Sequence, residues 1–243
     1  MAYWHDTWSF QNSIEHEFKF AGKYGAKGEK RQKKKKPTPG QIAKQNQRNK
    51  ETRMRRTIKA NFAEKDLWCC CKYPEGVRLQ IEDVKKDKSR FLRILRREYE
   101  KRGSPLKWVA RLEIGERGGI HFHILVNRLW KSQSDILIAD AWSRALERSA
   151  LQSIRPGCRT EGLVDWASTY DSGGYKALAD YICKQPEEGT EEYKQLSLFA
   201  PEEQKQLLSV TSSRNLIRPE PERHYYSRRT MRKLVEDGPE PTP

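Results

Sequence analysis

The hydrophobic positions between residues 66 and 219 follow strand and helix periodicities in turn. Leu67–Tyr73 (LWCCCKY) is short, apolar and followed by Pro74, which is typical of a buried strand. Glu82–Arg102 repeats apolar residues at helical spacing and stops before a Gly-Ser-Pro turn, which predicts an amphipathic helix. The other predicted elements are strands over 107–114 and 120–126, a helix over 133–149, a weak strand over 158–166, an acidic loop over 187–203, a short helix over 175–185 and a candidate last strand over 206–211. Strands and helices in mixed order predict an α+β domain with an antiparallel sheet.

The two ends of the chain have less pattern. The stretch Gln41–Asn61 contains good helix formers behind a candidate cap at Thr38, but it has few apolar positions with which to pack on a core. We therefore expect an N-terminal arm over residues 1–65 that is partly helical or disordered. Residues 220–243 are rich in arginine and proline and are expected to form a loosely held tail.

Positive charge is concentrated in one segment. The chain has a net charge of +15, and residues 21–60 hold 15 Lys and Arg against two acids. Two interpretations stay open: a solvated, partly disordered arm, or an arm that binds phosphates and becomes ordered on nucleic acid. A block of one sign beside a nearly neutral remainder favours the second. The candidate DNA-contacting residues of the arm are Lys33, Lys34, Lys35, Lys36, Arg48, Arg53, Arg55 and Arg56.

Composition excludes several classes of protein. Hydrophobic residues make up 35% of the chain and charged residues 33%, and no apolar run approaches the roughly 18 residues of a membrane span. The first residues lack the continuous apolar stretch of a secretory signal. Five cysteines, three of them adjacent at positions 69–71, make a poor disulfide framework. We expect a protein of a reducing cytoplasm with no membrane partner.

The hairpin over residues 107–126 carries the candidate chemistry. A five-residue loop, Gly115–Gly119, would pair Ile114 with Ile120, so that paired residue numbers sum to 234. This register places Glu113 opposite His121, with His123 two residues further along the same face. A slip by one residue would bury Glu113 in the core, which is costly.

Two imidazoles and one carboxylate on one face suit a divalent ion that keeps open coordination positions. A His-x-His pair alone is a weak signal, because surface strands carry such pairs by chance. The converging Glu113 strengthens the metal interpretation. The other three histidines, His5, His16 and His224, lie outside the predicted core, so a site with three or four histidine ligands is hard to build.

A second candidate lies on the short helix over 175–185. Tyr181 and Lys184 are three residues apart and share one helical face, whereas Tyr175 points about 120° away. Taken alone, Tyr181 reads as a half-buried core residue and Lys184 as a solvated charge. A tyrosine nucleophile needs help because its phenol titrates near pH 10, and a neighbouring ammonium with a metal-polarised phosphate would supply that help.

These motifs in this order resemble the HUH endonucleases, and more narrowly the rolling-circle replication initiators, or Rep proteins, of phages, plasmids and single-stranded DNA viruses. The resemblance covers roughly residues 66–219 and rests on LWCCCKYP (67–74), Glu113 eight residues before His121, HFH (121–123), YICK (181–184) and SRNLIRP (213–219). It implies a five-stranded antiparallel sheet with flanking helices, a ferredoxin-like arrangement.

The resemblance also implies an activity. His121, His123 and Glu113 would hold Mg²⁺ or Mn²⁺ against the scissile phosphate of single-stranded DNA at a replication origin. Tyr181 would attack that phosphate to form a 5′-phosphotyrosine link and free a 3′-OH, with Lys184 positioning the phosphate or metal. Arg111, on the predicted metal face, and Arg214, in the last motif, complete the candidate DNA-contacting set. Many phage-type members carry a second tyrosine where this chain has Ala177, so the chain resembles the single-tyrosine type.

The sequence contains no Gly-x4-Gly-Lys-Ser/Thr loop, so unwinding and synthesis would fall to a host helicase and polymerase, which implies the cytoplasm of a bacterial host cell. Two alternatives remain. A mobilisation relaxase or a single-tyrosine transposase would use the same chemistry. A non-catalytic nucleic-acid-binding protein would keep the histidines for structure alone.

Overall fold

The computed structural model describes residues 2–11, 13–22, 36–63, 66–73, 77, 79–129, 133–146, 157–163 and 175–236, with 157–163 described by their backbone alone. The chain divides into two compact units. The first comprises Met1–Ala60, Ala167–Ala179 and Ile217–Pro243, and the second comprises Asn61–Trp166 and Asp180–Leu216. The N-terminal and C-terminal segments, which the sequence predicts as separate arm and tail, therefore form one unit.

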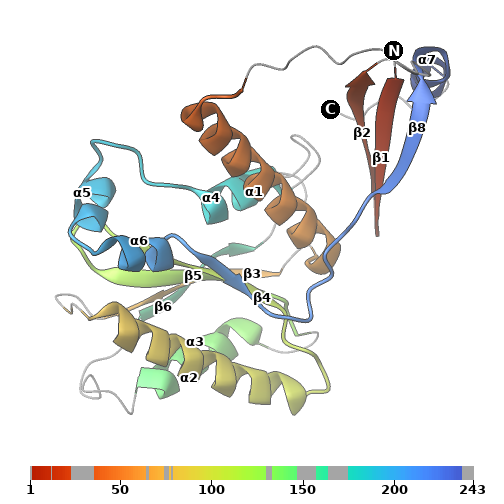
Figure 1. Ribbon diagram of the computed structural model, residues 1–243. Helices are drawn as coiled ribbons and strands as arrows, with labels where there is room; N and C mark the ends of the chain where they lie inside the picture. Colours follow the sequence, from red (N-terminus) through yellow and green to blue (C-terminus); the bar gives the residue numbers. More distant parts are fainter. Residues whose placement is uncertain are drawn as a thin grey trace. The chain divides into compact units, whose positions relative to one another are not determined.

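The first unit is built on a three-stranded antiparallel sheet with the order β2-β1-β8 (Figure 1). Its elements are β1 (Ala2–Phe10), β2 (Ser13–Gly22), α1 (Pro39–Asn61), β8 (Glu222–Ser227) and α7 (Arg228–Glu236). In the sheet, His5 on β1 pairs with Phe18 on β2 and with His224 on β8.

Residues 2–22 are strands, which corrects the expectation of a partly helical or disordered arm there. The helix expected over 41–61 is present as α1, and Thr38 caps it by accepting a hydrogen bond from the Gln41 amide at 3.3 Å. The strand pattern escapes notice because a charged residue, Asp6, is fully buried in β1. Its carboxylate binds Lys19 and also Arg223, which lies 217 residues away. No local window of sequence contains that partner.

The second unit holds a five-stranded antiparallel sheet with the order β6-β3-β5-β4-β7. Its elements are β3 (Leu67–Lys72), α2 (Ile81–Glu100), β4 (Trp108–Ile114), β5 (Ile120–Val126), α3 (Ser134–Leu146), β6 (Gly157–Leu163), α4 (Lys176–Cys183), α5 (Glu191–Ser197), α6 (Pro201–Leu207) and β7 (Val210–Ser212). Helix α4 begins in the first unit and ends in the second. The α+β class with antiparallel strands is confirmed. The expectation of one sheet is wrong, because the first unit adds a second.

The acidic segment that was expected to be a loop contains two short helices, α5 and α6. Thr190 caps α5 by accepting a hydrogen bond from the Tyr193 amide at 3.2 Å. At α6, the Ala200 amide donates to the Glu203 carboxylate at 3.0 Å and Pro201 occupies the first turn. Helix α6 also takes residues 206 and 207 from the predicted last strand, which is left as the three-residue β7. Capping side chains outweighed the weak apolar pattern in this segment.

The hydrophobic core of the second unit lies between its sheet and helices α2 and α3, which cover one face of that sheet (Figure 1). The inward residues of the central hairpin are the two predicted apolar sets: Trp108, Ala110, Leu112 and Ile114 on β4, and Ile120, Phe122, Ile124 and Val126 on β5. The predicted division of the hairpin into a core face and an opposite face is thus confirmed. The opposite face carries the candidate site.

Among the residues that the structure describes, no helix combines the length and the apolar character that crossing a membrane requires.

Candidate active site

The register of the β4–β5 hairpin is the predicted one. Ile114 pairs with Ile120, Glu113 with His121 and Arg111 with His123. The Gly115 amide donates to the Gly119 carbonyl at 2.9 Å, and Gly118 takes a positive φ of 73° that an L side chain rarely adopts. The short loop therefore fixes which residues face each other.

Glu113, His121 and His123 converge as this register requires. One carboxylate oxygen of Glu113, Oε2, lies 2.8 Å from Nε2 of His123 and 3.8 Å from Nε2 of His121. The side chains are sheltered but not all sealed, with exposed fractions of 11% for Glu113, 20% for His121 and 3% for His123. The cluster thus offers one oxygen and two nitrogens at the edge of solvent.

The cluster favours the protonation states that bind metal ions. Burial alone would raise the pKa of Glu113, but its hydrogen bond with His123 and the charges of His123, Arg111 and His121 lower the pKa to about 2. Burial lowers the pKa of His121, against the attraction of Glu113. Near neutral pH, an ionised carboxylate therefore faces an imidazole that prefers its neutral form, and both are the ligand forms.

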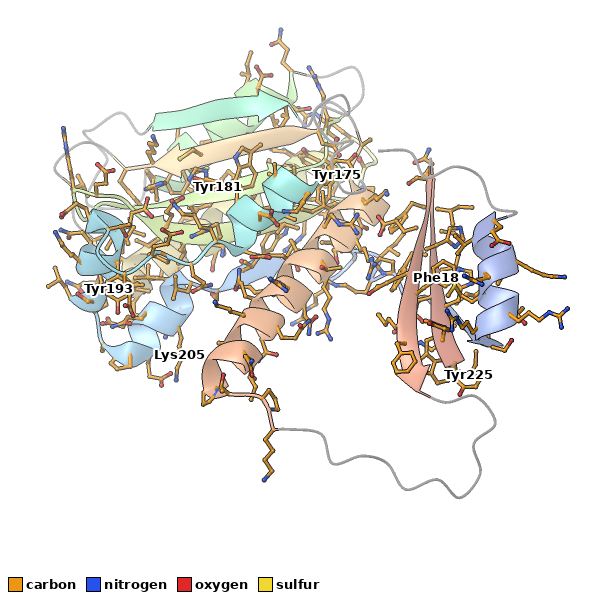
Figure 2. All side chains as sticks on the ribbon, turned by 90° about the horizontal axis from the view of Figure 1, so that it is seen from above. Phe18, Tyr175, Tyr181, Tyr193, Lys205 and Tyr225 are labelled. Carbon is orange, nitrogen blue, oxygen red and sulfur yellow. The ribbon has the colours of Figure 1, made fainter. Side chains whose placement is uncertain are left out.

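Tyr181 brings a phenol into the same cluster from α4. Its hydroxyl donates to Oε2 of Glu113 at 3.0 Å and lies 3.2 Å from Nε2 of His123. The side chain is 37% exposed, so a substrate can reach it (Figure 2). Tyr175, at the start of the same helix, is only 1% exposed. Of the two tyrosines on this helix, Tyr181 is the accessible one.

Trp68 on β3 braces both His123 and Tyr181, a contact that the sequence reasoning missed. Its ring stacks on His123 with centroids 5.3 Å apart and meets Tyr181 edge-on at 5.9 Å. The signal was present in the sequence: Cys69 and Cys71 belong to the core face, so alternation along a strand sends Trp68 to the opposite face. The aromatic wall restricts the orientation of the imidazole and the phenol.

Arg111 does not lie where a DNA-contacting residue would. It is 4% exposed, and its guanidinium donates to the backbone carbonyls of Tyr181 at 2.5 Å and Lys184 at 3.3 Å. These carbonyls are at the C-terminal end of α4, where a helix leaves its acceptors unpaired and where positive charge is favourable. The structure thus gives Arg111 a positioning contact to α4 in place of the predicted DNA contact.

The remaining predicted residues are dispersed. Lys184 directly follows α4, and its ammonium pairs with Glu192 at 3.4 Å. Arg214 and Lys36 are exposed. Lys33, Lys34 and Lys35 lie outside the described residues.

The predicted arginines of α1 fall into two pairs. Arg55 and Arg56 are largely buried and bind the Glu15 carboxylate at 2.7 Å and 3.1 Å, so their charge is neutralised within the fold. Arg48 and Arg53 are exposed and line a cleft of about 960 Å³ within the first unit. The other cations lining this cleft are Lys19, Arg56, Arg218 and Arg223, against the acids Asp6, Glu17 and Glu220.

Cys70 on β3 adds a sulfur ligand that the sequence reasoning did not consider. Its thiol sulfur lies 3.9 Å from Nε2 of His123. The ligand atoms of Cys70, His121 and His123 all lie within 4.8 Å of one another, so the three residues form a possible metal-binding group. The donor sets fit a divalent ion: carboxylate oxygen and imidazole suit Mg²⁺ or Mn²⁺, and thiolate with imidazole suits softer ions.

An antiparallel α+β domain with a carboxylate, two imidazoles and a tyrosine hydroxyl at one point defines a protein with a candidate metal centre beside an accessible phenol. Residues 66–186 match the family model of the replication-associated proteins of the ORF2 type. The match covers the residues of this cluster and supports a rolling-circle replication initiator family, and thus a replication-associated protein. No curated protein and no solved structure matches the chain.

Proposed function

We propose that this protein initiates rolling-circle DNA replication by nicking and rejoining single-stranded DNA through Tyr181. The observation that carries the proposal is the position of the Tyr181 hydroxyl, 3.0 Å from Glu113 and 3.2 Å from His123 at the candidate metal centre. A nucleophile needs to lie beside the group that binds its electrophile, and this geometry meets that need. The family match to replication-associated proteins points the same way.

The proposed reaction is a transesterification. The Tyr181 oxygen attacks the scissile phosphorus, the bond from phosphorus to the 3′ oxygen breaks, and the phenol proton ends on that oxygen as a free 3′-OH. The products are a 5′-phosphotyrosine and a primer end. Glu113, His121 and His123 would hold Mg²⁺ or Mn²⁺, which polarises the phosphate and lowers the barrier to attack.

The other side chains of the cluster orient the reacting groups. With a pKa of about 2, Glu113 is too weak a base to remove a phenol proton, so its hydrogen bond with Tyr181 directs the hydroxyl. Trp68 and His123 flank the phenol ring and limit its rotation. Lys184 would position the phosphate once DNA draws it from Glu192.

We further propose that the cleft of the first unit binds the phosphates of the single strand. Arg48 and Arg53 project from α1 beside Gln45, Asn49 and Thr52, side chains that can all donate hydrogen bonds. Helix α1 carries seven Lys and Arg against one acid, Glu51. A cationic groove with many donors suits a phosphodiester backbone. We assign unwinding and synthesis to a host helicase and polymerase in the bacterial cytoplasm.

The test is a covalent trapping experiment. A labelled pool of single-stranded oligonucleotides of random sequence is incubated with the protein and Mn²⁺, and the mixture is denatured in detergent. A protein–DNA adduct is expected for the wild type and for Tyr193→Phe, and its loss is expected for Tyr181→Phe. Tyr193 is a matched control because it is 38% exposed on α5, compared with 37% for Tyr181.

An adduct that survives in Tyr181→Phe would move the nucleophile, and Tyr175→Phe would then locate it. DNA binding without any adduct would favour a non-catalytic nucleic-acid-binding protein. Sequencing the trapped DNA gives the cleavage site, and with it a distinction between a replication origin and the transfer origin of a relaxase or the end of a transposon.

A further inference from the structure

The strand β3 directs one of its three adjacent cysteines into the candidate metal centre. Cys70 pairs with His123 across the β3–β5 ladder, whereas Cys69 and Cys71 belong to the hydrophobic core on the other face. Cys70 is fully buried and reduced, and its sulfur lies 3.9 Å from Nε2 of His123. A thiol, two imidazoles and the carboxylate of Glu113 therefore surround one small volume.

The spacing of these atoms fits a tetrahedral ion. With a Zn–S bond of about 2.3 Å and a Zn–N bond of about 2.05 Å, tetrahedral ligands S and N lie about 3.6 Å apart. The observed separation of 3.9 Å between Cys70 and His123 needs only a few tenths of an ångström of adjustment. The third ligand atom, on His121, lies within 4.8 Å of both. One cation can thus contact all three residues after a small side-chain rotation.

We propose that the centre has two ligand sets that share the histidine pair: Glu113 completes it for oxygen-preferring ions, and Cys70 completes it for thiophilic ions such as Zn²⁺ and Co²⁺. The chemical reason is ligand softness, because thiolates select zinc-like ions and carboxylates select Mg²⁺ and Mn²⁺. The thiol proton leaves as the softer ion binds. Because both sets use His121 and His123, the two classes of ion exclude each other.

The proposal rests on the histidine pair of the proposed active site but not on its reaction. It deepens the proposed function by naming a class of ion that would occupy the centre without the Glu113 ligand. In that state Zn²⁺ competes with Mn²⁺ for the imidazoles, and Cys70 determines how strongly. A serine at position 70 would leave the oxygen-preferring set intact and weaken the thiophilic set.

The decisive measurement is the absorption spectrum of the full-length protein titrated with Co²⁺. A thiolate bound to Co²⁺ gives an intense near-ultraviolet charge-transfer band, and Co²⁺ with only nitrogen and oxygen ligands does not. The band is expected in the wild type and in Cys183→Ser, which removes a different fully buried cysteine. It is expected to disappear in Cys70→Ser and in Cys70→Ala, while visible bands from Co²⁺ on the histidines persist.

Affinities give a second readout. Competition with a chromophoric chelator should show Zn²⁺ binding weakened about 10- to 100-fold in Cys70→Ser, the range typical for loss of a metal-site interaction. Mn²⁺ binding, followed by electron paramagnetic resonance, should change less than about threefold in that variant and should weaken about 10- to 100-fold in Glu113→Gln. Zinc added to the wild type should release Mn²⁺ in stoichiometric amount.

Two outcomes would overturn the proposal. The first is bound Co²⁺ in the wild type without a charge-transfer band, which needs no variant and so does not depend on whether a substituted protein folds. The second is a band that persists in both Cys70 variants. Neither outcome bears on the tyrosine adduct, so a failure here and a failure of the nicking proposal are distinguishable.

Discussion

Single side chains set the geometry of the tyrosine more than they supply charge to it. Arg111 lies in the middle of β4 and donates to the carbonyl of Tyr181 itself and to that of Lys184. Its guanidinium carbon also lies 5.8 Å from the centre of the Tyr181 ring. A planar fork of donors is required to bridge two carbonyls in this way, and an ammonium cannot reproduce it.

Arg111→Lys is therefore expected to disturb the position of Tyr181 while preserving the charge. The rate of adduct formation should fall about 100-fold, the loss that a displacement of about 1 Å can cause at a reacting centre. The dissociation constant for the oligonucleotide, measured by fluorescence anisotropy, should change less than about twofold. Equal losses in rate and affinity would contradict a positioning role for Arg111.

His121 offers a test of the metal role that leaves the phenol untouched. It lies 3.8 Å from Glu113, and the hydrogen bond that Tyr181 donates goes to Glu113. His121→Ala is expected to reduce Mn²⁺-dependent adduct formation at least about 100-fold, since a metal ligand is lost, and to leave oligonucleotide binding nearly unchanged. Mn²⁺ titration followed by denaturing gels measures the first quantity and anisotropy the second. A folded variant that loses both together would argue against this division of roles.

At the scale of secondary structure elements, Glu15 joins β2 to α1. Its carboxylate accepts hydrogen bonds from Arg55 at 2.7 Å, Lys59 at 2.8 Å and Arg56 at 3.1 Å, and it is 13% exposed. Burial alone would raise the pKa of Glu15, but the hydrogen bonds from Arg55 and Lys59 lower it to about 2. The ionised carboxylate therefore stabilises the contact between strand and helix.

The pH dependence of this contact follows from the lowered pKa. The stabilisation is fully present above the ordinary pKa of 4.5 and is lost as the pH falls towards 2. Glu15→Gln should lower the free energy of unfolding by about 3 kcal/mol at pH 7, and the difference should shrink steadily below about pH 4.5. Urea denaturation of both proteins at several pH values measures it.

Glu17→Gln is the control for this experiment. Glu17 lies on the same strand with an exposed fraction of 39% and pairs with Arg56 at 3.2 Å. An exposed pair contributes little, so the loss should stay below about 1 kcal/mol. Equal effects of the two substitutions would show that the buried network around Glu15 is not special.

At the scale of the whole molecule, charge is divided between fold and surface. The basic arm is not a uniform cationic tail, because Glu15 neutralises Arg55, Arg56 and Lys59 inside the first unit. The pairing of β1 with β8 also means that deleting residues 1–60 would remove the sheet partner of the C-terminal strand. Substitutions on α1 therefore test DNA binding more cleanly than a truncation does.

We expect Arg48→Gln combined with Arg53→Gln to weaken binding of a single-stranded oligonucleotide at least about tenfold at about 0.1 M salt. The slope of log affinity against log salt should flatten by about 1.4, since each phosphate contact on a single strand contributes about 0.7. Both residues line the cleft, and glutamine preserves helix propensity. Anisotropy titrations over a range of salt concentrations measure both quantities.

Lys44→Gln combined with Lys50→Gln is the matched control, because it removes the same charge from the same helix at positions outside the described lining of the cleft. Its effect should stay below about threefold. Equal weakening by both double variants would indicate attraction by net charge alone and would remove the cleft as a specific binding surface.

The sequence by itself determined the central hairpin and the convergence of Glu113, His121 and His123. Both depend on short-range rules: alternation along a strand and the length of one loop fix the register, and the register fixes the neighbours. The same rules predicted α2 and the two apolar faces of the hairpin. The meeting of Tyr181 with this cluster followed only from the family resemblance, because its partners there lie 58 and 68 residues away along the chain.

Tertiary structure alone decided the rest, because the partners are distant in sequence. Asp6 is buried against Arg223, Glu15 removes the charge of Arg55 and Arg56, and Arg111 is covered by the end of α4. A charged residue looks the same in a sequence whether it faces solvent or a buried partner, since its desolvation is offset by a group that no local window contains.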